Sequence, residues 1–254
     1  MLTRRTALAA PALLLAAAAR PPLAAEPISR MSTPWWRRRF EAKLAEARSR
    51  PIDLVWLGDS ITENWEHHGP PAWQDFAPIW QHYYGHRNAL NLGFKGDATS
   101  HLLWRLMNGE TANIHPRAAV LLIGANNMGL AHWSAADTLT GIAAILAELR
   151  IRWPNTRILL ISVLPSIRSP WVTETTATIN QGLAARYGSG ADPSYVDVTR
   201  LFETAGHINP TRFYDPLLTP PDPPLHPTAP TQAHLAAAIE PTLAHLLGDQ
   251  PVAA

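Results

Sequence analysis

Three residues with chemically useful side chains stand where apolar stretches of this chain give way to turns. Ser60 closes the stretch VWLGDS, Asn126 lies in IGANN, and His226 lies in the proline-rich stretch 215–230. A serine hydroxyl is a poor nucleophile at neutral pH unless a histidine removes its proton. An amide side chain and N–H groups beside glycine can stabilise the oxyanion that such an attack creates. These residue types together predict acyl transfer through Ser60.

Other polar residues in the same stretches have plainer interpretations. Asp59 is expected to cap the turn that follows the first apolar run, because aspartate side chains commonly accept hydrogen bonds from N–H groups two residues on. Asp97, in NLGFKGDAT, is expected to brace its own loop, and Asn127 is expected to bond to backbone groups.

Apolar runs alternate along the chain with helical patterns, which predicts a parallel sheet covered on both faces. The clearest helical pattern covers 135–152, with Ser134 and Asp137 as a capping box; further helices are expected at 33–50 and near 230–247. The fold is therefore expected to be a three-layer α/β/α sandwich, whose ligands bind at the carboxyl ends of the strands. The expected strands, about five in number, are Ile52–Leu57, Ala89–Leu92, Ala118–Ile123, Ile158–Leu164 and Tyr195–Val198.

Residues 1–25 have the character of an export signal. Arg4 and Arg5 precede an apolar run that is followed by small residues, and the segment contains no acidic residue. The run is too short for a membrane span, which needs roughly 20 apolar residues. The arginine pair resembles that of a twin-arginine signal. We therefore expect an exported protein, periplasmic or secreted, cut near Ala25, with no stable membrane insertion.

Composition excludes several classes of function. Loss of residues 1–25 with their three arginines leaves 18 basic and 20 acidic residues, so nothing electrostatic favours nucleic acid as a partner. The chain has no cysteine and therefore no thiolate metal site. His67 and His68 lack the spacing of a zinc helix, and no phosphate-binding glycine motif occurs. Most of the ten tryptophans are expected to pack in the core. We expect no metal and no cofactor.

Four blocks in order resemble the SGNH (GDSL-like) hydrolases. They are GDSIT, GFKGDAT, GANN and the final loop with its aspartate and histidine; GDATSHLLWRLMNGE (96–110) looks like the platelet-activating-factor acetylhydrolase-like branch. The resemblance covers roughly residues 50 to 247. It implies a flavodoxin-like hydrolase domain at 51–248, preceded by residues 26–50 with an amphipathic helix.

The resemblance also implies roles for individual residues. Ser60 corresponds to the nucleophile and His226 to the general base. The oxyanion donors correspond to the N–H groups of Ser60 and Gly96 and the side chain of Asn126. The family usually places its aspartate three residues before the histidine, but Pro223 holds that position here and Asp222 lies four before. Either the loop bulges and Asp222 completes a triad, which we favour, or Ser60 and His226 act as a dyad.

The function expected from these features is hydrolysis of short acyl esters. Ile61 and Leu225 flank the nucleophile and the base and are expected to close a short acyl pocket. Export favours O-acetylated polysaccharide as substrate, with acetyl as the group removed. Two alternatives remain open: a lipid ester or thioester hydrolase of the same fold, and a catalytically impaired carbohydrate-binding protein. The oligomeric state cannot be predicted from the sequence.

Overall fold

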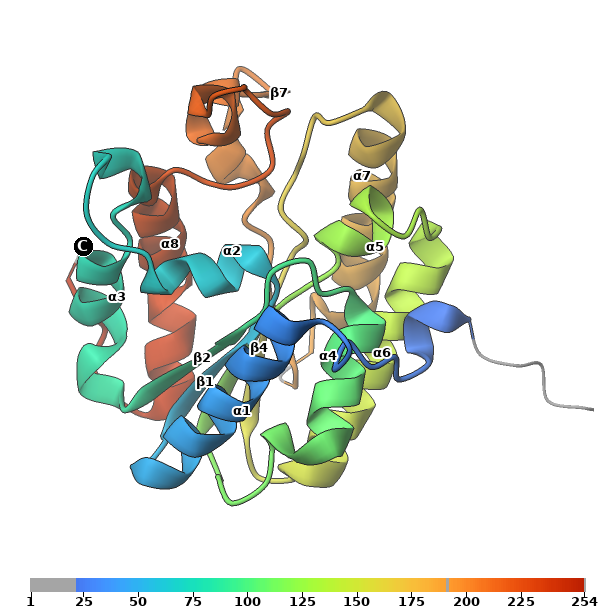
Figure 1. The fold of residues 1–254 in the computed structure, drawn as a ribbon. Helices are drawn as coiled ribbons and strands as arrows, with labels where there is room; N and C mark the ends of the chain where they lie inside the picture. The colour runs from blue at the N-terminus through green and yellow to red at the C-terminus, as the bar shows by residue number, and fades with distance from the viewer. Residues whose placement is uncertain (1–21, 191, 254) are drawn as a thin grey trace, which may run out of the picture.

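Five parallel strands form the centre of the protein (Figure 1). The computed structural model describes residues 22–190 and 192–253. The strands lie in the order β2-β1-β3-β4-β5, and every neighbouring pair is parallel. The predicted three-layer fold with a five-stranded sheet is therefore confirmed. The strands are β1 (Leu54–Gly58), β2 (Ala89–Gly93), β3 (Ala118–Leu122), β4 (Arg157–Ile161) and β5 (Ser194–Val196).

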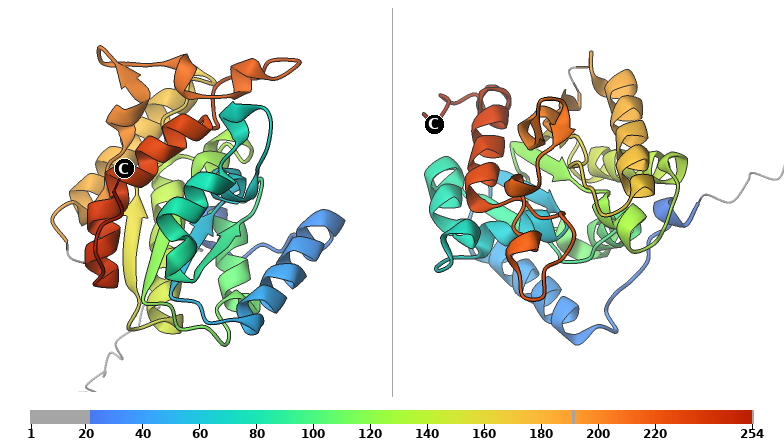
Figure 2. Two further views of the ribbon diagram at one scale, coloured as in Figure 1. Left: turned by 90° about the vertical axis from the view of Figure 1, so that its left-hand side faces the viewer. Right: turned by 90° about the horizontal axis from the view of Figure 1, so that it is seen from above.

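Helices cover both faces of this sheet. Seen from above, α3 and α8 lie on one side of the sheet and α6 and α7 on the other (Figure 2). The helices predicted at 33–50, 135–152 and 230–247 are all present. The longer helices are α1 (Pro34–Ser49), α3 (Ala77–Tyr84), α4 (Thr99–Arg105), α6 (Ala135–Arg152), α7 (Pro170–Tyr187) and α8 (Ala229–Leu247). Single turns are Leu23–Ala25, Asn64–Glu66, Ala72–Gln74, Gly85–Arg87, Thr199–Phe202, Pro210–Arg212 and Asp215–Leu217, with a π-helical turn at Leu106–Glu110.

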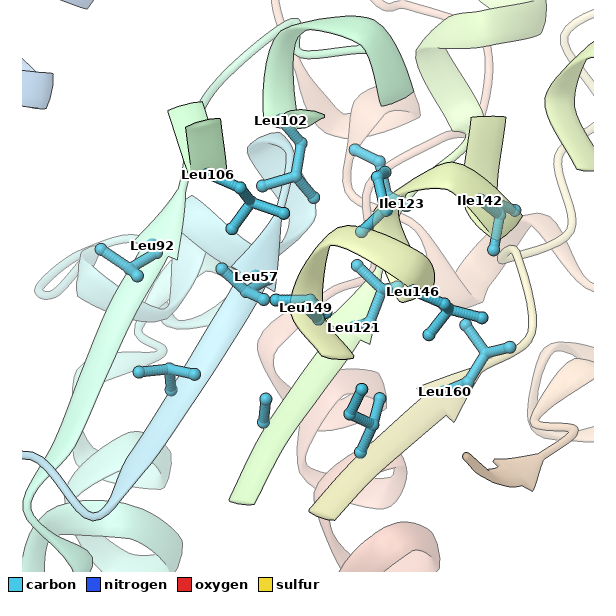
Figure 3. Packing of buried hydrophobic residues seen from close by; sticks show 14 of the residues in the cluster. Leu57, Leu92, Leu102, Leu106, Leu121, Ile123, Ile142, Leu146, Leu149 and Leu160 are labelled. Carbon is cyan, nitrogen blue, oxygen red and sulfur yellow. The ribbon is translucent and has the colours of Figure 1, made fainter. Parts of the chain in front are cut away.

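The alternation of side chains along the strands divides the core into two clusters. Leu57 of β1 packs with residues of α4, α6 and α7, whereas its neighbour Trp56 packs with residues of α3 and α8. Figure 3 shows the first cluster, with Leu57, Leu121 and Leu149 close together between the sheet and α6. Successive side chains of a strand point to opposite faces, so continuous apolar strands need helices on both sides. The described helices are each shorter or less apolar than a membrane crossing requires.

The strand predicted at Ile158–Leu164 ends earlier, at Ile161. Ser162 still donates its N–H to Val196, but at Val163 the side chain of Asn180 takes the place of a neighbouring strand. Asn180 accepts from Val163 N at 2.9 Å and donates to Val163 O at 2.8 Å. The backbone N–H and carbonyl of Val163 are thus both paired where the chain leaves the sheet, and the chain continues as a loop to α7.

The segment before α1 packs against the body of the protein. Ala24 is fully buried, and its carbonyl oxygen accepts a hydrogen bond of 2.7 Å from Thr99 Oγ1. Cleavage after Ala25, as the sequence predicts, would remove this contact. The remainder of the predicted signal, up to residue 21, lies outside the described residues.

Candidate active site

The first strand delivers Ser60 to the carboxyl edge of the sheet. β1 ends at Gly58, and the short helix α2 (Ser60–Glu63) begins directly beyond it. Asp59 caps this helix, since its Oδ1 accepts from Ile61 N at 3.0 Å; the predicted capping role is confirmed. A Cβ atom at Gly93 would lie 2.2 Å from Glu63 N, so α2 crosses the end of β2 at a distance that only glycine permits. Strand packing therefore fixes the position of the Ser60 hydroxyl.

His226 joins Ser60 to a buried carboxylate. Ser60 Oγ lies 2.9 Å from His226 Nε2, and His226 Nδ1 lies 2.6 Å from Asp215 Oδ1. Asp215 is 3% exposed and its Oδ2 also accepts from the N–H groups of Leu225 and His226, at 2.8 and 2.6 Å. Hydroxyl, imidazole and carboxylate thus form one connected chain, the arrangement that makes serine nucleophilic.

The carboxylate in this chain is not the one expected from the sequence. Asp222 is exposed and makes no contact with the imidazole; only its backbone N–H bonds back, to Asp215 O at 3.0 Å. The prediction that Asp222 orients His226 is therefore wrong. Local spacing favoured Asp222, whereas Asp215 lies 11 residues before the histidine.

Backbone pairing explains how Asp215 reaches across this separation. Phe213 forms an antiparallel bridge with Pro227, and Tyr214 N donates to His226 O at 2.9 Å. The two ends of the proline-rich loop therefore run side by side. The residues between them form a loop that is closed at its base by this pairing. A missed sequence signal is the pair Tyr214-Asp215, an aromatic residue and a carboxylate at the start of the loop.

Tyr214 holds the imidazole from its face. Its ring stacks on His226 with centroids 5.3 Å apart and an interplanar angle of 11°, and the ring of Trp73 stacks on Tyr214 with centroids 5.1 Å apart. Asn64 Nδ2 donates to the Tyr214 hydroxyl at 2.9 Å. Burial raises the pKa of Tyr214 to about 12, so the ring remains neutral beside the histidine.

The electrostatics keep Asp215 ionised. Burial alone raises the pKa of this carboxyl, but the hydrogen bond and charge of His226 and the two backbone donors outweigh it, and its pKa lies below the usual value. An ionised Asp215 accepts a hydrogen bond from the Nδ1–H group of His226, and this leaves Nε2 unprotonated and free to take the proton of Ser60. The imidazolium formed during attack is stabilised by the same carboxylate.

The predicted oxyanion donors lie at the same edge of the sheet. Gly96 has a φ of +75°, a conformation that suits glycine, in the loop after β2. Asn126 is the second residue of the short helix α5 (Ala125–Gly129), which follows β3. Its Nδ2 donates to Asp97 O at 3.0 Å and only weakly, at 3.4 Å, towards Asp59 Oδ2. The N–H group that makes the longer of these two hydrogen bonds, towards Asp59, is the one that can donate to an oxyanion instead.

Buried polar contacts brace this loop. Asp97 accepts from Trp36 Nε1 at 2.8 Å and from Arg105 Nε at 2.9 Å, and also from Arg30 Nη1 at 2.9 Å. Asn127 bonds to Thr99 N and Oγ1 at 2.9 and 2.7 Å. The structural roles predicted for Asp97 and Asn127 are confirmed.

A further loop, after β4, links the segments of the site. Ser166 Oγ donates to Pro224 O at 2.9 Å, and Arg168 Nη2 donates to Ala125 O at 3.2 Å. The histidine loop and the turn of Asn126 are therefore tied to one common element. Sequence reasoning missed both residues.

The expected acyl pocket takes a different form. Ile61 is 2% exposed and packs within the core, so it does not line an open pocket, while Leu225 is half-buried beside His226. A cavity of about 280 Å³ instead adjoins Gly96 and Asn126. Another cavity, of about 780 Å³, lies between α7 and the hairpin of β6 (Glu203–Thr204) and β7 (His207–Ile208), and none of the triad residues lines it. The cavity beside the oxyanion donors is the one next to the chemistry.

Metal ligands do not gather anywhere in the described part of the chain: no three His, Asp or Glu side chains there lie close enough to hold an ion. The Ser60–His226–Asp215 chain has the geometry of a serine hydrolase site on a parallel α/β sheet.

Comparison with known proteins gives the family. The profile of the GDSL-like lipase/acylhydrolase family matches residues 56–234, which is most of the chain. The chain belongs to this family and is thus a hydrolase of the SGNH esterase class, as the four blocks indicate.

Curated relatives are subunits of platelet-activating factor acetylhydrolase IB. The alpha2 subunit of Rattus norvegicus is 28% identical over 165 residues, covering 64% of this chain and 66% of that protein. The beta subunit homolog of Drosophila melanogaster is 33% identical over 145 residues, covering 57% and 58%. The chain spans less than two-thirds of the length of either relative.

Solved structures share the fold. A GDSL-like lipase from Bacteroides thetaiotaomicron superposes with a TM-score of 0.62 at 17% identity, over 82% of this chain and 97% of the other. A carbohydrate esterase family 3 protein from Talaromyces cellulolyticus gives a TM-score of 0.55 at 16% identity, over 78% and 99%. The three-layer architecture is therefore that of SGNH hydrolases.

Proposed function

We propose that this protein is a serine esterase that removes a small acyl group, acetyl, from an oxygen atom of a carbohydrate. The observation that carries the proposal is the continuous contact from Ser60 Oγ through His226 to Asp215, beside the donors Gly96 and Asn126. Ester hydrolysis needs these parts: a nucleophile, a base with an oriented tautomer, and donors for the oxyanion.

The reaction proceeds in two halves. Ser60 Oγ attacks the ester carbonyl carbon as His226 Nε2 takes its proton, and the oxyanion accepts hydrogen bonds from Ser60 N, Gly96 N and Asn126 Nδ2. The bond to the alcohol then breaks, and His226 returns the proton to the leaving oxygen. Water, deprotonated by His226, attacks the acyl-enzyme and releases the carboxylic acid, with the proton returned to Ser60.

Acetate and carbohydrate are supported by separate considerations. The curated relatives are named as acetylhydrolases, and one fold neighbour is named as a carbohydrate esterase. The export signal expected at residues 1–25 supports a periplasmic or secreted location, where O-acetylated polysaccharide is met.

A second candidate is hydrolysis of longer acyl esters or thioesters. The volume of the cavity beside the oxyanion donors, about 280 Å³, is the observation for it, because it exceeds what an acetyl group fills; the polar Arg30 and His101 in the cavity wall are the observation against it. The third possibility, a binding protein with an impaired triad, rested on the displaced Asp222. The contact of Asp215 with His226 removes that reason.

Hydrolysis of 4-nitrophenyl acetate tests the proposal. The wild-type protein is expected to turn over this ester, and Ser60→Ala is expected to lose activity while it keeps its melting temperature. Equal rates for the two proteins would refute a serine esterase. Acetate release from O-acetylated polysaccharides then tests the carbohydrate assignment.

A further inference from the structure

The cavity beside the oxyanion donors is built partly by residues that precede the family match. Ile28 and Arg30, from the segment before α1, line it together with Gly96, Asn126 and the residues Ala98, His101, Leu130, Ala131 and Trp133. The family match begins only at residue 56. One wall of the cavity therefore comes from residues outside the family match.

Hydrogen-bond donors dominate the polar lining. Arg30 carries a guanidinium, and Trp133 an indole N–H. His101 Nδ1 accepts from Ala98 N at 2.9 Å, so the neutral ring carries its proton on Nε2. Burial lowers the pKa of His101, which keeps the ring in this neutral form. Among the described residues that line the cavity, none is Asp or Glu.

Arg30 is held in place over the oxyanion loop. Its Nη1 donates to Lys95 O and to Asp97 Oδ1, both at 2.9 Å, and its guanidinium lies 3.3 Å from where a Cβ atom of Gly96 would be. Asp97 has a second cationic partner, the fully buried Arg105. The side chain of Arg30 is 22% exposed, so its guanidinium is held in position by hydrogen bonds and is still accessible to a ligand.

A donor-rich cavity with a fixed guanidinium and no carboxylate suits an anion. Trp133 adds an aromatic surface of the kind that packs against sugar rings. We propose that this cavity binds the carboxylate of an acidic sugar, so that the substrate is an acetylated uronic-acid glycoside. The inference rests on the proposed esterase function and names the substrate class of the same site.

Matched substrates test this inference. Mono-acetylated methyl glucuronoside carries the carboxylate, and its uronamide is the neutral counterpart of the same shape. The wild-type protein is expected to prefer the carboxylate by about tenfold in kcat/KM, the scale of one hydrogen bond to a charged group. Arg30→Gln is expected to bring this ratio close to one, and Arg30→Lys to retain part of it. Arg38→Gln removes the same charge from an exposed position on α1 and should leave the ratio unchanged.

The ratio separates binding from support of the loop. If Arg30 only braces the loop of Gly96, Arg30→Gln lowers kcat/KM equally for both substrates, and the inference fails. A stronger preference for acetylated glycerol phosphate over glycerol acetate than for the uronate over its amide would overturn the sugar assignment. If the protein hydrolysed none of these esters (the two acetylated sugars and 4-nitrophenyl acetate), the esterase proposal itself would be refuted. If it hydrolysed both sugars at equal rates, only the proposed carboxylate subsite would be refuted.

Discussion

Replacing Asp215 by asparagine should disable the histidine through its tautomer. The N–H groups of Leu225 and His226 both donate to Asp215 Oδ2, so the asparagine carbonyl oxygen must occupy that position. The amide NH₂ then faces His226 Nδ1, where the carboxylate oxygen lay at 2.6 Å. Because NH₂ only donates, Nδ1 must accept and the ring proton moves to Nε2. A protonated Nε2 cannot take the proton of Ser60.

The expected loss is about 10⁴ in kcat, by analogy with the same change in serine-protease triads. That factor corresponds to about 5 kcal/mol in the activation free energy. Steady-state hydrolysis of 4-nitrophenyl acetate measures it, with the melting temperature as a check on folding. If the new amide were instead flipped, its NH₂ would face the two backbone donors and leave them unpaired, and the melting temperature would fall as well.

Asp222→Asn is the matched control. It makes the same chemical change in the same loop, but the side chain is exposed and only its backbone N–H bonds to the site. We expect near wild-type kcat for this variant. A severe loss in Asp222→Asn with activity retained in Asp215→Asn would show that the carboxylate contact described here does not operate in solution.

Four further outcomes are expected. Asn126→Ala should lower kcat by about 10²–10³ and lower the melting temperature modestly, because Asp97 O loses a buried donor; a kcat near that of the wild type would remove this side chain from oxyanion binding. Acetyl esters should exceed octanoyl esters in kcat/KM, because Arg30 and His101 make the cavity wall too polar for a long chain; an octanoyl preference supports the lipid or thioester alternative. Burial raises the pKa of Asp59 to about 6, so the folded state keeps a proton that the unfolded chain releases, and stability falls as pH rises from about 4 to 6. Asp59→Asn should reduce this pH-dependent fall in the free energy of unfolding by up to about 3 kcal/mol, as measured by urea unfolding at pH 4 and 7. If the free energy of unfolding of the variant depended on pH as that of the wild type does, Asp59 would not be the group responsible. A tagged full-length chain should appear outside the cytoplasm and shortened, and because Ala24 packs against the body of the protein we expect the cut upstream of that residue; full-length protein in the cytoplasm would argue against export.

Much of the architecture could be predicted because it depends on local patterns. Apolar runs such as Ala118–Leu122 are buried on both faces, and this burial is visible in the sequence as an absence of polar residues. The polar residues that end these runs, including Ser60 and Asn126, must then meet at one edge of a parallel sheet. Alternation of strands and helices therefore predicted that these residues meet, and the resemblance to SGNH hydrolases implied the role of each.

The parts that were missed depend on contacts between distant segments. Asp215 reaches His226 only because residues 213 and 227 pair and the loop between them closes on itself. Arg30 reaches the oxyanion loop across 65 residues of sequence. Helix α7 was not predicted from the sequence, because its many threonines are poor helix formers and the helix is stabilised by tertiary packing. Spacing along the chain carries no record of such contacts.

Covalent labelling tests the central claim, that Ser60 is the nucleophile, most directly. A fluorophosphonate that reacts with activated serines should add once to the wild-type protein, and peptide mapping should place the adduct on Ser60. Ser60→Ala should remain unlabelled, and Asp215→Asn should react far more slowly. An adduct on another residue, or full ester hydrolysis by a protein that takes up no label, would contradict the account.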